Sequence, residues 1–189
     1  LYQGAPSTNY GSEVSIAVGV DSQGTASVGL VKFISSDLAT IPSSATIDSA
    51  YLVLTRGISE GSVQGKAWMA SYNWSENSIT WNTAGGTGSY SGIVTATLTG
   101  QQGSTCTINV TTAVRLWHSN AVNNDGFVIG AISPTTAGNS VLFYTKEALS
   151  SWRPKLQINY TVPSSAVYDN FANALDAGTG SGFTANTSN

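Results

Sequence analysis

The chain has 189 residues, of which 41% are hydrophobic and 9% are charged, and its formal net charge at pH 7 is −3. This length suits one domain with a sizeable core. The seven basic residues form no cluster, which argues against nucleic acid as a partner. The sequence contains no run of about 18 apolar residues, so no membrane-spanning helix is predicted. Because the sequence is rich in hydroxyls and poor in charge, we expect an extracellular location, secreted or at the cell surface. The start at Leu1 rather than Met is interpreted as a mature or trimmed product.

Short stretches of alternating apolar and polar residues follow one another from the start of the chain. Residues 1–3 are expected to end a first strand, and in residues 13–20 the side chains of Val14, Ile16 and Val18 share one face. Residues 28–34 are apolar enough to predict a strand buried on both faces. Loops are expected at residues 57–65 and 82–92, and further strands at residues 47–56, 66–73, 93–98, 105–110, 127–132, 141–145 and 156–162.

One helix is expected among the strands. Val110, Val114 and Trp117 recur at the spacing of one helical face, and Thr111 or Thr112 is the expected N-cap. About ten short strands with turn signals between them predict an all-β fold over residues 1–162, an antiparallel jelly-roll-like β sandwich with one short helix. Cys106 is the single cysteine, so no internal disulfide is expected.

The composition changes at Pro163, and residues 163–189 are interpreted as a C-terminal tail that is either a linker or a docking segment. The tail is made mostly of small and polar residues, interrupted by four larger apolar ones. A short amphipathic helix and an extended docking strand both fit this spacing. The four are the expected assembly contacts, namely Val167, Phe171, Leu175 and Phe183.

Two tryptophans, Trp74 and Trp81, bracket a short polar turn that contains Glu76. Each indole ring buries on the order of 200 Å² while its N–H still requires an acceptor. We expect a structural corner of a β domain, with an aromatic platform for sugar rings as the alternative.

Four blocks of the sequence together carry a family resemblance. They are Pro6-x-x-Asn9-Tyr10-Gly11, Trp74-x-Glu76-x-x-Ile79-Thr80-Trp81, Val110-Thr111-x-x-Val114-x-x-Trp117 with Asn124-x-Gly126-Phe127, and Tyr144-Thr145-x-Glu147 with Arg153-Pro154-x-Leu156-x-Ile158-x-Tyr160. Over residues 1–162 the chain resembles the DNRLRE domains, also called disaggregatase-related modules and grouped with carbohydrate-binding modules.

The resemblance implies a non-catalytic jelly-roll-like sandwich appended to secreted polysaccharide-processing or cell-surface proteins, and some relatives bind acidic polysaccharides. It also implies that most motif residues preserve corners and core: Trp74, Glu76, Trp81, Trp117, Glu147 and Arg153. Two features depart from the family pattern. Asn109 stands where members usually carry Asp, and the tail has no recognised counterpart.

Catalytic chemistry has little support in the sequence. His118 is the single histidine, so no histidine-based metal cluster or proton relay is available. Glu76 and Glu147 are the one carboxylate pair to test for glycoside hydrolysis. We expect each instead to accept hydrogen bonds from the backbone or from Arg115 or Arg153. The chain is therefore predicted not to be an enzyme, with no catalytic residue.

No cofactor or metal is assigned, although Asp21, Asp125 and loop carbonyls are possible ligands of a structural Ca²⁺. N-glycosylation sequons are candidate sites for covalent glycans. They occur at Asn73, Asn109, Asn159 and Asn186, of which the first three fall in predicted strands or in a tight corner. Asn186 is therefore the most accessible.

Two functions of different classes remain open. The first, which we favour, is a structural subunit of a surface filament, assembled when the tail of one copy adds to the sandwich of the next. The second is a carbohydrate-binding module that recognises a polysaccharide, with acidic polysaccharides included. Its binding residues are expected to be Trp68, Tyr90 or Trp152, stacking on sugar faces, with Arg56 or Lys66 holding an acidic group.

Overall fold

The computed structural model describes residues 1–57, 63–85, 90–98, 103–131 and 136–163, with residues 90–98 described by their backbone alone. The strands are β1 (Ser15–Val20), β2 (Ala26–Ser27), β3 (Gly29–Val31), β4 (Thr46–Thr55), β5 (Val63–Ala70), β6 (Tyr90–Leu98), β7 (Thr105–Asn109), β8 (Phe127–Ala131), β9 (Asn139–Tyr144) and β10 (Lys155–Thr161). The helices are α1 (Ser35–Leu38), α2 (Thr111–His118) and the 3₁₀ turn η1 (Ser150–Trp152). All strand pairs are antiparallel.

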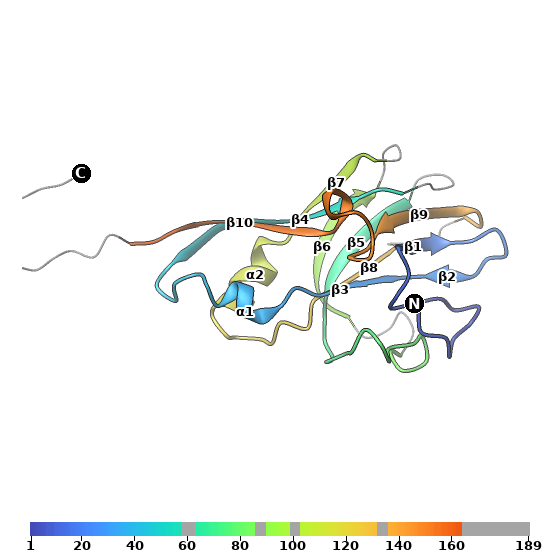
Figure 1. Ribbon diagram of the computed structural model, residues 1–189, viewed down its shortest axis with the longest axis horizontal. Coiled ribbons are helices and arrows are strands. Elements are labelled where there is room, and N and C mark those ends of the chain that lie inside the picture. The colour runs from blue at the N-terminus through green and yellow to red at the C-terminus, as the bar shows by residue number, and fades with distance from the viewer. Residues whose placement is uncertain (58–62, 86–89, 99–102, 132–135, 164–189) are drawn as a thin grey trace, which may run out of the picture.

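The strands form two layers around one core (Figure 1). In the first layer, the sheets β2-β1-β9 and β10-β4-β7 meet at the bridge between Arg56 and Phe143, reinforced by the bond from Gly57 N to Leu142 O at 2.8 Å. The second layer is the sheet β3-β8-β5-β6. Side chains of alternate strand residues, such as Leu52 and Ile129, are fully buried between the layers. The predicted antiparallel β sandwich is therefore confirmed.

Helix α2 lies against β4, and its apolar side packs into the core, where Val114 and Trp117 are buried. The helix begins at Thr111, but neither predicted threonine is its N-cap, because Val110 holds that position. Asn109 performs the capping chemistry from one residue earlier. Its Oδ1 accepts hydrogen bonds from Thr111 N at 3.0 Å and from Thr111 Oγ1 at 2.7 Å.

Several predicted boundaries differ from the structure. Residues 63–65 belong to β5 rather than to a loop, and Tyr90 begins β6 rather than lying in a loop. The strand predicted at residues 28–34 ends at Val31, and Ile34 is 69% exposed, so this segment is not buried on both faces. The predicted tail contacts, Val167, Phe171, Leu175 and Phe183, lie outside the described residues.

Candidate functional site

The tryptophan corner lies on the outer face of the sheet β3-β8-β5-β6. There Trp74 and Trp81 are half-buried against a small second cluster that includes Val28 and Val128. The Trp74 Nε1–H donates to the carbonyl of Asp125 at 2.7 Å, which satisfies the indole while its ring stays packed. The corner therefore adds a third, partial layer to the sandwich.

The first residues of the chain hold this corner in place. The Asn9 amide donates to the carbonyls of Glu76 and Ile79, both at 2.7 Å. Gly11 packs so closely that a Cβ at its position would lie 2.3 Å from the Glu76 carbonyl oxygen. These contacts explain why the Asn9-Tyr10-Gly11 block and the tryptophan block occur together, because the first block binds and positions the backbone of the second.

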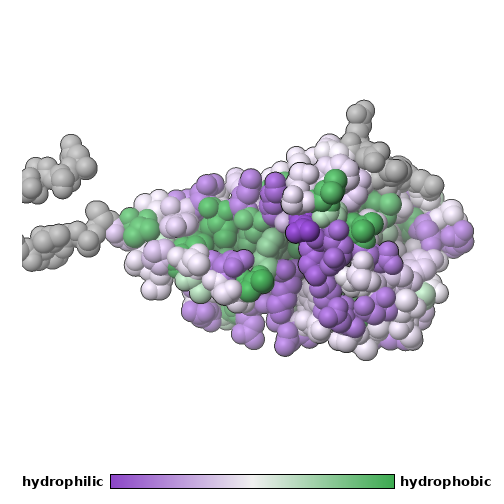
Figure 2. Space-filling model, in the orientation of Figure 1, coloured by the Kyte–Doolittle hydropathy of each residue, from purple (hydrophilic) through white to green (hydrophobic). Residues whose placement is uncertain are grey.

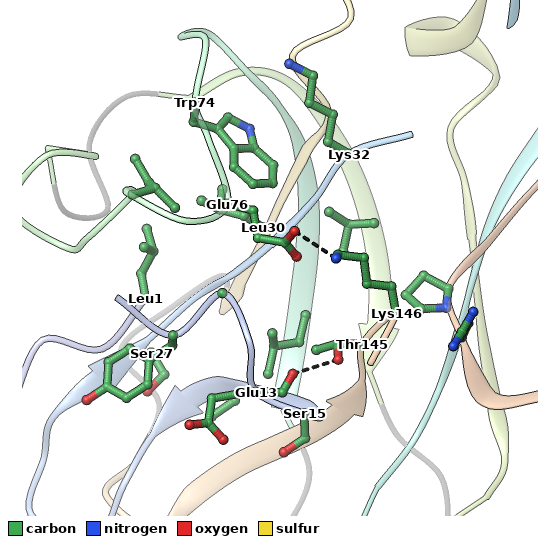
Figure 3. Close-up of a pocket in the computed structure, with 18 of the residues that line it drawn as sticks. Leu1, Glu13, Ser15, Ser27, Leu30, Lys32, Trp74, Glu76, Thr145 and Lys146 are labelled. Carbon is green, nitrogen blue, oxygen red and sulfur yellow. Dashed lines mark hydrogen bonds and ion pairs between the residues drawn. The ribbon is translucent and has the colours of Figure 1, made fainter. Parts of the chain in front are cut away.

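A cleft of about 1170 Å³ opens beside this corner (Figure 3). It is bordered by β1, by the chain that follows β9, and by β3 with the segment after it. The lining combines three chemistries: aromatic rings, cations and carboxylates. These are the side chains of Tyr2, Tyr10, Phe33 and Trp74, of Lys32, Lys146 and Arg153, and of Glu13, Asp21, Asp37 and Glu76.

An ion pair crosses the cleft and divides it into two arms. Lys146 Nζ lies 3.0 Å from Glu76 Oε2, with Trp74 and Lys32 on one side of the pair and Glu13 and Ser15 on the other (Figure 3). We call the first side the β3 arm, lined by residues 30–34, and the second the β1 arm, lined by Glu13, Ser15, Ile16, Ala17 and Ser140. The β3 arm is mainly apolar and the β1 arm mainly polar.

Lys146 also binds Glu147, with 2.8 Å between Nζ and Oε1. Hydrogen bonds to Glu147 and Glu76 raise the pKa of Lys146, and the bond from Lys146 lowers the pKa of Glu147. Lys146 holds the two carboxylates in place of the expected backbone or arginine donors, although the charge of Arg153 also helps to lower the pKa of Glu147. Arg115 Nε donates to the Ile47 carbonyl at 2.8 Å, and Arg153 Nε donates to the Ala148 carbonyl at 3.0 Å.

An aromatic platform lies next to the cleft. The rings of Tyr144 and Trp152 stack with centroids 4.6 Å apart and planes inclined by 25°. Trp152 is 38% exposed, whereas the other four tryptophans are half-buried or buried. Arg153, which follows Trp152 directly, lines the cleft. The chain thus places a partly exposed indole, stacked on a second ring, one residue before an arginine that lines a cleft with cations and carboxylates.

The remaining sugar-binding candidates lie elsewhere. Trp68 is half-buried in the second cluster, and its ring covers Gly130, where an added Cβ would meet the ring at 3.0 Å. Lys66 lies opposite Gly130 in the pairing of β5 with β8, and it is also half-buried. Arg56 is only 6% exposed, so its charge does not reach the surface as a glycan contact would require. The side chain of Tyr90 lies outside the described part of the structure.

Three sequons are described by the structure, and each asparagine side chain takes part in a hydrogen bond. Asn73 accepts from Lys32 Nζ at 3.3 Å, Asn109 caps α2, and Asn159 donates to Ser49 Oγ at 2.9 Å. Their use as glycosylation sites stays a prediction, as does that of Asn186, which lies outside the described residues.

The candidate Ca²⁺ ligand Asp21 and the single histidine, His118, both make hydrogen-bonding contacts within the fold. Asp21 accepts from the Tyr2 hydroxyl at 2.9 Å and from the backbone of Thr25 at 2.8 Å. Within the described ranges no three acidic, histidine or cysteine side chains gather as metal ligands would. His118 lies half-buried at the end of α2, with Nε2 3.0 Å from the Pro42 carbonyl oxygen.

The fold defines a class of protein, a β-sandwich module, here with an exposed aromatic pair beside a cleft. The chain belongs to carbohydrate-binding module family 96, whose model matches residues 2–160. The resemblance to DNRLRE domains is thereby confirmed, because this family corresponds to the DNRLRE domain. No curated protein matches the chain. Modules of this kind are typically non-catalytic.

Sequence reasoning missed two features of the site. Tyr144 was assigned only to a motif, although its ring supports Trp152. Lys146 was not singled out, although it joins Glu76 and Glu147. The ion pair between Lys146 and Glu147 could have been predicted, because the two residues are adjacent in the sequence. The ion pair between Lys146 and Glu76 could not, because it forms where two loops meet. Among the described helices, none is long and apolar enough to cross a membrane.

Proposed function

We propose that this domain binds a polysaccharide at the platform of Trp152 and Tyr144, with the sugar chain continuing over Arg153 into the β1 arm of the cleft. The observation that carries the proposal is the exposed, ring-supported face of Trp152 at the edge of a cleft. An indole face offers a flat apolar surface for the C–H side of a pyranose ring. The family membership supports the same class of ligand.

The polar groups beside the platform suit sugar hydroxyls. Carboxylates accept and cations donate hydrogen bonds, so Glu13, Lys146 and Arg153 offer both roles within one cleft. The side chain of Lys146 is 61% exposed, which leaves its ammonium accessible despite its two ion pairs. An acidic sugar would add charge-assisted bonds to Arg153, so acidic polysaccharides are included among the proposed ligands.

Affinity electrophoresis through gels that contain single neutral or acidic polysaccharides tests this function. At least one polysaccharide should retard the wild-type chain, and Trp152→Ala should restore its mobility. Leu149→Ala is the matched control, because Leu149 is an exposed apolar neighbour without a ring. If Trp152→Ala is retarded as strongly as the wild type, the platform is not the binding site.

The sequence also predicts secretion, glycosylation and assembly into a filament, and these three properties stay predictions. The low charged fraction of 9% supports an extracellular setting. Assembly through the tail depends on residues outside the described ranges, so it stays a prediction. It is compatible with sugar binding at Trp152, which lies on η1 rather than on an edge strand.

A further inference from the structure

The outer face of the sheet β10-β4-β7 carries an aromatic ring at its centre. In β4 the side chains of Ala50 and Leu52 are fully buried, so Tyr51 between them points to the outer side. Tyr51 is half-buried and lies opposite Gln157 of β10 and opposite Asn109 of β7. In these three strands, all of which the structure describes, Tyr51 is the one outward-facing aromatic residue. A row of three side chains therefore crosses the sheet, with a ring flanked by an amide on each side.

The polar groups of this row have hydrogen-bonding capacity to spare. Within the described part of the structure, the Gln157 amide and the Tyr51 hydroxyl have no hydrogen-bond partner. Asn109 uses its Oδ1 to accept from Thr111, which leaves its N–H₂ group available. Neighbouring strands lie about 5 Å apart, so the two amides stand roughly 10 Å apart across the ring. Side-chain amides both donate and accept hydrogen bonds, as the hydroxyls on the two edges of a sugar ring require.

The surface around Tyr51 is polar and nearly uncharged. Of the outward-facing residues of β10, β4 and β7 that lie between the row of Lys155 and the row of Asn159, all described, Lys155 is the one charged residue. Hydrophilic side chains gather above β10 in Figure 2, whereas the apolar surface lies below it, toward α1. A face of amides and hydroxyls without a carboxylate suits an uncharged sugar better than an ionic ligand.

This face continues from the platform of Trp152. Phe143 of β9 is fully buried, so Tyr144, the next residue, points to the outer side of the same layer. Trp152 stacks on Tyr144 and therefore lies on that outer side as well. The turn η1 ends at Trp152, and β10 begins at Lys155. The row of Tyr51 follows two residues later, about 7 Å further along β10.

We propose that Tyr51, Gln157 and Asn109 form a second subsite, which takes an uncharged pyranose unit of the polysaccharide that stacks on Trp152. The sugar chain leaves the β1 arm, crosses Trp152 and continues along the outer face of β10 and β4. There the Tyr51 ring supplies the apolar contact, and the two amides bond the hydroxyls on either side of it. This inference extends the platform site and so rests on the polysaccharide binding proposed above.

Affinity electrophoresis at a series of polysaccharide concentrations tests the subsite, with hydroxyethylcellulose, arabinoxylan, galactomannan and polygalacturonate as probes. At least one of the uncharged probes should retard the wild type. Tyr51→Ala should weaken that binding by about tenfold, less than Trp152→Ala does, because a phenol ring offers less apolar surface than an indole. Tyr51→Phe, which keeps the ring, should stay within about threefold of the wild type.

An exposed position and a matched control guard against effects on folding. Gln157 is exposed, and Gln157→Ala should weaken binding by about threefold through loss of a hydrogen bond. Gln64 is an exposed glutamine of β5 in the other layer, and Gln64→Ala should bind as the wild type does.

The variants separate this inference from the platform on which it rests. Dissociation constants of Tyr51→Ala and Gln157→Ala equal to that of the wild type overturn the subsite, even where Trp152→Ala has lost binding. Weakened binding of Tyr51→Ala together with unchanged binding of Trp152→Ala supports the subsite and contradicts the platform. A wild type that is retarded by polygalacturonate alone, or by none of the probes, overturns the assignment of an uncharged sugar.

Discussion

At the scale of single residues, the tryptophans divide between structure and binding according to what lies behind each ring. Trp74 and Trp81 pack onto the second cluster, and the Trp74 N–H is bonded to a backbone carbonyl. Trp117 is buried in the core against Phe127, with ring centroids 4.8 Å apart. Trp152 alone among the five combines an exposed face with a supporting ring.

Trp81→Ala should lower the free energy of unfolding by about 3 kcal/mol, the low end of the range for a large aromatic, because the ring is half-buried. Chemical denaturation measures this loss. Asn77→Ala, in the exposed turn between the two tryptophans, should stay within about 0.5 kcal/mol of the wild type. A Trp81→Ala midpoint equal to that of Asn77→Ala would show that the corner is not structural.

At the scale of elements, Lys146 fastens the loop after β9 to the tryptophan corner through Glu76. The folded-state pKa of Glu147 lies below its ordinary value of 4.5 because of the bond from Lys146. The bond between Lys146 and Glu147 therefore stabilises the folded chain fully above the ordinary pKa of 4.5. This stabilisation is lost as the pH falls through the lower pKa that Glu147 has in the folded state.

Lys146→Met should lower the melting temperature at pH 7, and the difference from the wild type should shrink on acidification to about pH 3. Thermal unfolding at a series of pH values measures both effects. Lys155→Met, at the exposed start of β10, is the control and should show no such convergence. A difference that is constant from pH 7 to pH 3 would contradict the role assigned to these ion pairs.

The sequence predicted those elements whose periodicity is local. The helical face of Val110, Val114 and Trp117 is buried as expected, and β4 agrees with the prediction within one residue at each end. The burial of Arg56 was not predictable, because it depends on the junction of two sheets far apart in the sequence. The stacking of Tyr144 and Trp152 likewise crosses the turn η1, where no periodic pattern exists.

At the scale of the whole molecule, the family and the cleft favour recognition of a polysaccharide over its cleavage. Glu76 and Glu147 are both bound by Lys146, which neutralises the one carboxylate pair that the sequence suggested for hydrolysis. Incubation with neutral and acidic polysaccharides should release no reducing ends. Release that disappears in both Glu76→Gln and Glu147→Gln would show the opposite.

Calorimetric titration with the polysaccharide that retards the wild type most is the most direct test of the central claim. Removing the ring in Trp152→Ala should weaken binding by about 2 kcal/mol, or roughly 30-fold, since a sugar ring covers on the order of 100 Å² of apolar surface. Trp152→Phe, which keeps a smaller ring, should lie between this variant and the wild type, and Leu149→Ala should bind as the wild type does. Equal affinities for Trp152→Ala and the wild type would contradict the account.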